Sequence, residues 1–492
     1  MEFYSTRGEG PVSGARAIVN GIAKDGGLYV PAEFPFIARE ELEDLVGLDY
    51  YERAAYIIHK YLDEFSYEEL KEYTEKAYSR FDEYPAPLTK VDEGTYIMEL
   101  WHGPTYAFKD IALTLLPYLL TGSKKKEGDD KKTLILVATS GDTGKAALEG
   151  FKDVGNTEIV VLYPSDGVSE MQKKQMTTTE GHNTHVIGIK GNFDDAQNAV
   201  KRIFASKEMN EKFAEAGYEL SSANSINFGR LVPQIVYYFS AYLDLLSEGE
   251  IEPEEQINFV VPSGNFGNIL AGYYAKRMGL PIKQLIVASN ENNVLTEFFE
   301  TGLYNARRKF HKTISPSMDI LVSSNLERLV YEMLNRESDK VVSLMEELKK
   351  DGEYSVDEDT LYDVAPEFIG YWSSEEETKN VIGNVFDEYG YLLDPHTAVA
   401  VSAFFKFMND AYDEASAVIL STANPYKFPQ SVLEAVSEQK ETDAFKAIKK
   451  LEMLTGAEIP EGIAELKNKP VLHDKVVEIK DIEDAVLSAI NA

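Results

Sequence analysis

One lysine stands in an otherwise aliphatic and aromatic stretch of the sequence, HGPTYAFKDIALTLLP. If a helix opens there at Pro104 or Thr105, the residues three, four and seven positions after Lys109 share its face. All three are apolar: Ala112, Leu113 and Leu116. Burial on such a face and the positive end of the helix dipole both lower the pKa of an amine. A neutral amine attacks aldehydes, so Lys109 is a candidate nucleophile, with a lysine that snorkels to the surface as the alternative.

Three loops follow expected strands and precede expected helices: TSGDTGK (139–145), PSGNFGN (262–268) and STANPYKF (421–428). In open parallel sheets, ligands bind beyond the carboxyl ends of the strands, where helix N-termini hold anions. Glycine lets the backbone approach a phosphate closely. The P-loop spacing GxxxxGK[ST] and the dinucleotide motif GxGxxG are both missing, which disfavours ATP-driven and NAD-dependent chemistry.

A single ligand accounts for both the lysine and the loops. Pyridoxal phosphate is an aldehyde that carries a phosphate, so Lys109 would form the Schiff base and a glycine loop would hold the phosphate. Lys109 alone is better explained as a snorkelling lysine, and the loops shift the balance toward the Schiff base.

Composition limits the other possibilities. The 492 residues are 44% hydrophobic and 27% charged, as in folded globular proteins. A net charge of −34 argues against binding to nucleic acid or to an anionic membrane surface. The chain has no cysteine, no HExxH motif, no run of about 18 apolar residues and no recognisable signal peptide. These features predict a cytoplasmic protein without a metal site.

Strands and helices alternate after Thr95, which predicts an α/β fold with mostly parallel sheets in two lobes. The expected core strands lie at 133–139, 158–164, 257–262, 284–289 and 416–422. The domain boundaries that follow are an N-terminal domain at 1–90, a catalytic core at 91–435 and a C-terminal helical tail at 436–492. An acidic helical stretch at about 305–390 breaks the alternation and is expected to be an insertion packed on the core.

The segment HGPTYAFKD closely resembles the HGPT-x-AFKD lysine motif of threonine synthases. The segments TSGDTG, SSANSINFGR, VPSGNFGN and STANPYKF match that family in order and spacing, and so does the opening, YSTRG…GIAKDGGLYVP. The match runs over nearly the whole chain and is most similar to the longer branch found in fungi and many bacteria. It implies a two-lobed tryptophan-synthase-β-like fold (pyridoxal phosphate fold type II) with an extra N-terminal domain and helical insertions. It also implies conversion of O-phospho-L-homoserine and water to L-threonine and phosphate.

The resemblance assigns cofactor contacts residue by residue. Lys109 would hold pyridoxal phosphate and then shuttle protons, and Thr422 would face the pyridine nitrogen. The cofactor phosphate would be bound by Gly264, Asn265, Phe266, Gly267 and Asn268. Asp142 stands near the cofactor hydroxyl where some relatives have asparagine, and an acid there needs either a partner or a proton.

The resemblance also implies contacts to the substrate. Ser140 and Thr143 are expected at the substrate carboxylate. Arg230, with Asn227 near it, is expected at the substrate phosphate; a surface cap or an interlobe salt bridge is the alternative for Arg230. Relatives often have TAHPAKF where this chain has Asn424 and Tyr426 in TANPYKF.

Other functions of the same fold stay open at this point. They are another β-replacement enzyme, an amino-acid dehydratase and a non-catalytic relative. The N-terminal domain and the SINFGR segment favour the synthase, and the family branch predicts a monomer or homodimer.

Overall fold

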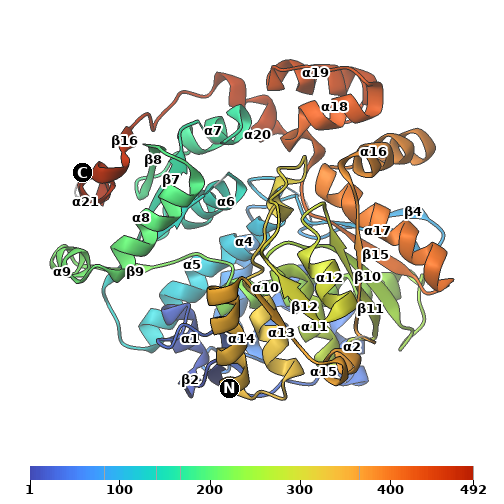
Figure 1. The fold of residues 1–492 in the computed structure, drawn as a ribbon, viewed down its shortest axis with the longest axis horizontal. Coiled ribbons are helices and arrows are strands. Elements are labelled where there is room, and N and C mark those ends of the chain that lie inside the picture. The colour runs from blue at the N-terminus through green and yellow to red at the C-terminus, as the bar shows by residue number, and fades with distance from the viewer. Residues whose placement is uncertain (83, 140, 167, 365, 491–492) are drawn as a thin grey trace.

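The computed structural model describes residues 1–490 apart from positions 83, 140, 167 and 365. Two sheets, each covered by helices, form two lobes (Figure 1). The larger sheet has the order β14-β11-β10-β15-β5-β4 and is parallel except for its edge strand β4. Its strands are β4 (Leu88–Asp92), β5 (Thr95–Glu99), β10 (Ile257–Pro262), β11 (Ile282–Ser289), β14 (Phe368–Trp372) and β15 (Ala417–Ser421).

The smaller sheet is fully parallel, in the order β16-β8-β7-β6-β9. Its strands are β6 (Lys132–Ala138), β7 (Thr157–Pro164), β8 (Thr184–Lys190), β9 (Tyr218–Ser221) and β16 (Val476–Glu478). Its surrounding helices are α6 (Asp142–Phe151), α7 (Glu170–Thr177), α8 (Phe193–Ala205), α9 (Lys207–Glu215) and α21 (Ile482–Ile490). The α/β fold with parallel sheets in two lobes is confirmed.

The expected core strands coincide with β6, β7, β10, β11 and β15 to within two residues at each end. Parallel strands covered on both faces must be apolar at consecutive positions, and β10 is buried along its whole length. For this reason, short runs of branched and aliphatic residues were enough to identify these strands in the sequence.

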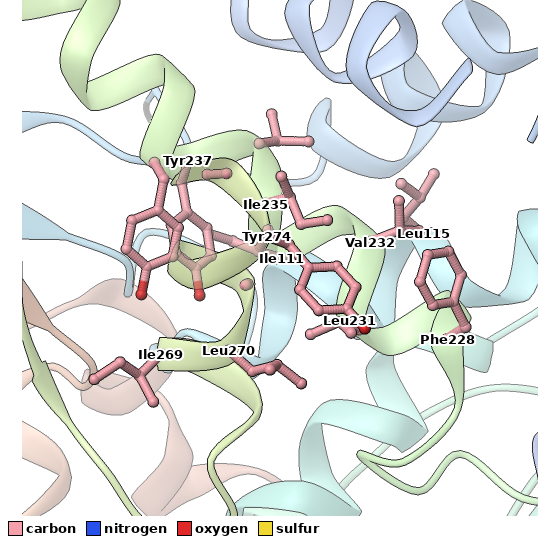
Figure 2. Close-up of a cluster of buried hydrophobic side chains, with 14 of the residues drawn as sticks. Ile111, Leu115, Phe228, Leu231, Val232, Ile235, Tyr237, Ile269, Leu270 and Tyr274 are labelled. Atoms are coloured by element: carbon pink, nitrogen blue, oxygen red, sulfur yellow. The ribbon is translucent and has the colours of Figure 1, made fainter. Parts of the chain in front are cut away.

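The long helix α10 (Phe228–Glu248) packs against both α5 (Lys109–Lys126) and α11 (Gly267–Arg277). Figure 2 shows their side chains meeting in one apolar cluster. The labelled members are Ile111, Leu115, Phe228, Leu231, Val232, Ile235, Tyr237, Ile269, Leu270 and Tyr274. The first turns of these helices carry Lys109, Arg230 and Asn268, so this core fixes the positions of three expected site residues.

The N-terminal segment forms a small antiparallel sheet and four helices. The sheet contains β1 (Glu2–Ser5), β2 (Val12–Ser13) and β3 (Tyr29–Pro31), and the helices are α1 (Gly14–Asn20), α2 (Arg39–Leu45), α3 (Tyr50–His59) and α4 (Tyr67–Tyr78). The expected boundary at residue 90 falls inside β4, which pairs with β5 of the larger sheet. Strand β4 therefore belongs structurally to the core.

The stretch at 305–390 is less uniformly helical than expected. It contains the turn η1 (Pro316–Met318), the short strand β13 (Glu353–Ser355), which pairs with β12 (Leu303–Asn305), and the core strand β14. Its helices are α13 (Leu326–Met333), α14 (Ser338–Asp351), α15 (Glu358–Val364) and α16 (Glu375–Tyr389), after α12 (Val294–Thr301) of the core. Because β14 extends the larger sheet, this stretch is partly built into the core.

The C-terminal tail also departs from a purely helical prediction. After α17 (Pro395–Ala411), the chain forms α18 (Pro429–Ser437), α19 (Ala444–Thr455) and α20 (Glu461–Ala464), then adds β16 to the edge of the smaller sheet. In Figure 1 this red segment crosses to the smaller lobe beside β8. Among the described residues, no helix combines the length and apolarity needed to cross a membrane.

Candidate active site

Helix α5 begins at Lys109 itself, and the expectation that it opens at Pro104 or Thr105 is wrong. Asp110 explains the difference, because its carboxylate accepts hydrogen bonds from the N–H and the hydroxyl of Thr105 at 2.8 and 2.6 Å. These bonds fold the preceding residues into a turn, in which Tyr106 has a φ of 60°. Lys109 is therefore the first helical residue, where the positive end of the dipole disfavours a charged amine.

Asp110 faces this turn and is fully buried. Burial raises its pKa to about 6, although the two bonds from Thr105 favour the ionised form. The partner of the Asp110 side chain is thus the turn just before the helix.

The loop after β15 lies alongside this turn. The carbonyl of Thr422 accepts a hydrogen bond from the N–H of Phe108 at 2.9 Å, and Ala107 pairs with Ala423 as an isolated β-bridge. Thr422, which is buried, is thus held beside the residue that precedes Lys109. This placement brings Thr422, expected at the pyridine nitrogen of the cofactor, close to Lys109, expected to hold the cofactor covalently.

The Lys109 amine contacts a residue that the sequence did not suggest. Its Nζ donates to the hydroxyl of Ser317 at 3.2 Å, and that hydroxyl lies 3.5 Å from Oδ2 of Asp142, to which it donates. Oδ1 of Asp142 forms an ion pair with Nζ of Lys427 at 3.2 Å. Lys427 also donates to the carbonyl of Thr105 at 2.7 Å. Two of the three strand–helix loops, and one residue from the stretch at 305–390, therefore converge on Lys109.

Lys427 could have been found from the sequence, because it is the single cation of the third loop, STANPYKF. Ser317 had no such signal, since it is one of several small polar residues in TISPSMD.

Burial favours the neutral form of the amine, and the surrounding charges act in both directions. Burial lowers the pKa of Lys109, Asp142 opposes that shift, and the cations Lys427 and Arg230 reinforce it. Asp142 shows the opposite behaviour: burial would raise its pKa, but Lys427 and then Lys109 hold it well below the usual range. Asp142 therefore has the partner that an acid at this position needs.

Arg230 is a buried cation without a carboxylate partner among the described residues. Its Nη1 donates to the carbonyl of Ala223 at 2.6 Å, and its Nε has no partner in the described part of the chain. Burial lowers its pKa to about 10, so it remains charged at neutral pH. These observations support neither a surface cap nor an interlobe salt bridge, and they leave a desolvated guanidinium suited to an anion.

Asn227 has a different arrangement from the one expected. Its Oδ1 accepts from the N–H of Gly229, which caps α10, and its Nδ2 donates to the carbonyl of Ile18 in the N-terminal segment. With both polar atoms engaged and the side chain buried, Asn227 holds the helix that carries Arg230.

The loop from Gly264 to Asn268 is shaped by its backbone. Phe266 has a φ of 60°, a conformation that non-glycine residues seldom adopt. Its buried ring packs on Phe299 and Phe368, with centroid separations of 5.9 and 5.8 Å. A Cβ on Gly264 would lie 2.9 Å from the carbonyl oxygen of Ser317, so the position has room only for glycine.

The loop fits a phosphate group. It leads into the first turn of α11, where N–H groups lack partners within the helix. Asn268 is buried, and its Oδ1 accepts from the hydroxyls of Tyr237 and Tyr238, which orients the amide. Its Nδ2 is a buried donor without a partner in the described residues. The carbonyl of Asn265 is engaged by Asn325 at 3.1 and 3.0 Å, which secures the loop from behind.

In the TSGDTG loop, Thr143 is half-buried in the first turn of α6. The hydroxyl of Thr139 accepts from the N–H groups of Gly141 and Gly144, which curls the loop at the end of β6. Ser140 lies outside the described residues. Within the part of the chain that the structure covers, no three His, Asp or Glu side chains gather as metal ligands would.

Three family models match the chain. The model for the threonine synthase N terminus covers residues 2–78, that for pyridoxal-phosphate-dependent enzymes covers 80–423, and that for the threonine synthase C-terminal region covers 397–486. The chain is 40% identical over 438 residues to a threonine synthase from Pseudomonas aeruginosa, covering 88% of this chain and 90% of that one.

Two solved structures agree with these matches over their whole length. A PLP-bound threonine synthase from Brucella melitensis has a TM-score of 0.89 at 37% identity and covers 100% of both chains. A threonine synthase from yeast has a TM-score of 0.89 at 33% identity, covering 100% of this chain and 99% of that one. This chain therefore belongs to the threonine synthase family of pyridoxal-phosphate-dependent enzymes.

Proposed function

We propose that the protein converts O-phospho-L-homoserine and water to L-threonine and phosphate, with pyridoxal phosphate attached to Lys109. The observation that carries this proposal is the arrangement of charge around Lys109. In a chain of net charge −34, the buried cations Lys427 and Arg230 both act on the Lys109 amine, beside the single low-pKa carboxylate of Asp142. Such an excess of desolvated positive charge suits a substrate that is itself strongly anionic.

The loop from Gly264 to Asn268 would hold the cofactor phosphate at the start of α11, and Thr422 would face the ring from the end of β15. When bound, the cofactor supplies an electron sink for the carbon skeleton of an amino acid. The protein then has to orient the substrate, hold its two anionic ends and move protons at the reacting carbons.

Two groups of this chain are proposed to fix the substrate. The first turn of α6, which carries Thr143, would accept the substrate carboxylate at a helix N-terminus, and Ser140, outside the described residues, is proposed for the same group from the sequence alone. Arg230 would bind the substrate phosphate, because its Nε donor and full charge have no partner among the described residues. Lys109 would carry protons between substrate carbons, a task for which an amine of lowered pKa is suited.

Phosphate release is the direct test. Purified protein with added pyridoxal phosphate should release inorganic phosphate and form L-threonine from O-phospho-L-homoserine, and borohydride should fix the cofactor onto Lys109. Lys109→Ala should lose both properties, with turnover reduced by roughly 10³-fold or more. A protein that holds the cofactor but releases no phosphate would instead fit the dehydratase alternative, which deamination of L-serine or L-threonine would reveal.

The proposal also covers the cellular location and the oligomeric state of the enzyme. We propose that it works in the cytoplasm as a monomer or homodimer on a small-molecule substrate. Light scattering at several protein concentrations would decide the oligomeric state.

A further inference from the structure

Ser317 lies in the stretch at 305–390, yet its hydroxyl lies between Lys109 and Asp142. It accepts from Lys109 Nζ at 3.2 Å and donates to Asp142 Oδ2 at 3.5 Å. The second distance is at the long limit for a hydrogen bond, so small movements of Ser317 would change the link between amine and carboxylate. The residue is half-buried.

A buried pair of residues sets the position of Ser317. Its main-chain N–H donates to Nε2 of His396 at 3.1 Å. Since a main-chain N–H can only donate, Nε2 must accept, and the ring proton is at Nδ1, where it meets Asp394 Oδ1 at 2.8 Å. His396 is 2% exposed and Asp394 is fully buried. The orientation of the ring is therefore fixed on both sides.

Two further contacts limit the movement of Ser317. Its carbonyl oxygen lies so close to Gly264 that a Cβ there would approach it to 2.9 Å. The turn around it is closed by a bond from the N–H of Met318 to the carbonyl of Ser315, whose hydroxyl in turn accepts from Asn290 at 3.0 Å. The turn is thus tied both to the loop expected to hold phosphate and to the end of β11.

We propose that Ser317 is a catalytic residue, whose hydroxyl holds the amine of Lys109 whenever that amine is free, and that His396 and Asp394 are the residues that position it. This inference rests on the proposed function. A long, flexible lysine side chain has several rotamers, and an acceptor at one point restricts it to those that remain directed at the substrate. Of the two Asp142 oxygens, Oδ1 is paired with Lys427 and Oδ2 accepts from the Ser317 hydroxyl itself.

The charged groups that act electrostatically on the Lys109 amine are Asp142, Lys427, Arg230 and Asp110. Ser317 adds a neutral acceptor, which favours the protonated amine slightly. Its removal should therefore lower the pKa of Lys109 further and also release the side chain from its fixed position. A residue that only supported the fold would change neither the pH dependence of this amine nor kcat selectively.

The experiment compares wild type with Ser317→Ala, Ser317→Thr and a matched control, Ser343→Ala, an exposed serine of α14. One measurement gives kcat and KM for O-phospho-L-homoserine against pH. The other uses cofactor-free protein and follows, against pH, how fast added pyridoxal phosphate becomes fixed to Lys109 by borohydride. Ser317→Ala should lower kcat about 10-fold or more, leave KM within about twofold and shift the attachment midpoint to lower pH. Ser317→Thr should restore most of the loss.

A second pair of variants tests the positioning residues independently. His396→Ala should reproduce the loss in kcat, and His396→Gln, which keeps an acceptor for the Ser317 N–H, should retain more activity. Unchanged kcat and an unchanged attachment midpoint in Ser317→Ala would overturn the inference, as would an equal loss in Ser343→Ala. If wild type released no phosphate, the proposed function would fail, and the attachment measurement would still decide the role of Ser317.

Discussion

Lys427 and Asp142 form an ion pair at 3.2 Å in which both side chains are at most 5% exposed. Asp142 begins α6 of the smaller lobe, and Lys427 follows the last strand of the larger sheet. The pair therefore joins the two lobes next to Lys109. Removing either charge would leave the other buried without its partner, which is costly in a medium of low dielectric constant.

The ion pair predicts strong coupling between two substitutions. Lys427→Met should lower the free energy of unfolding by about 3–5 kcal/mol, since it leaves Asp142 uncompensated. The double variant with Asp142→Asn should recover most of that loss, as urea unfolding of all four proteins would measure. The exposed pair Lys190–Glu478, at 2.8 Å, is the control and should show a coupling of about 1 kcal/mol or less. Additive effects at Lys427 and Asp142 would contradict the interpretation.

Gly264 predicts a steric effect on cofactor binding. A Cβ at this position would lie 2.9 Å from the carbonyl oxygen of Ser317, so Gly264→Ala must displace either the loop or the turn. We expect pyridoxal phosphate to bind about 10-fold or more weakly, measured by titration of the cofactor-free protein. Gly47→Ala is the control, because a Cβ there meets nothing within 4 Å. Equal affinity in the two variants would show that the loop has room to spare.

We predict that replacing Arg230 weakens substrate binding and increases protein stability. Arg230→Met removes a buried, unpaired charge, so it should raise the free energy of unfolding by about 1–3 kcal/mol. The same change should raise KM for O-phospho-L-homoserine about 10- to 100-fold, through loss of charged hydrogen bonds to phosphate.

Inorganic phosphate gives a second measurement on the same variant. It should raise the melting temperature of wild type and of the control Arg202→Met, an exposed arginine on α8, but not that of Arg230→Met. If phosphate stabilised Arg230→Met as well as wild type, the phosphate site would have to lie elsewhere.

The raised pKa of Asp110 predicts that the free energy of unfolding depends on pH. Its pKa is about 6 in the folded protein, against 3.8 for an unperturbed aspartate, so the folded state retains a proton that the unfolded state has lost. This contribution is complete below pH 3.8 and is lost as pH rises through 6, by about 3 kcal/mol in all. Between pH 4 and pH 7, the unfolding free energy of the wild type should therefore fall relative to that of Asp110→Asn. A difference independent of pH would show that Asp110 is ionised throughout.

The parts of the fold that the sequence predicted are those governed by local rules. Strands buried on both faces must be apolar at consecutive positions, so β10 and β11 were located closely. The edge strands β14 and β16 give a weaker signal, because the runs FIGYW and VVE are short and only partly buried. Both were consequently absorbed into segments expected to be helical.

Some features of the candidate site could likewise be predicted from the sequence, and others could not. Lys109 and the glycine loop could be found because their residue types are unusual for their places in the chain. The start of α5 could not, since it depends on how Asp110 bonds to Thr105. The contact between Ser317 and Lys109 joins segments far apart in the sequence, and a serine carries no signal of such a contact.

Strand β15, formed by residues 417–421, lies in the middle of the larger sheet, between β10 and β5. Strand β5, at residues 95–99, therefore leaves the ribosome long before the neighbour that joins it to β10 has been made. The smaller sheet likewise gains its edge strand β16 only at residues 476–478. Nascent chains must consequently carry strand edges without their final partners through most of translation, and exposed edges of this kind are prone to aggregate.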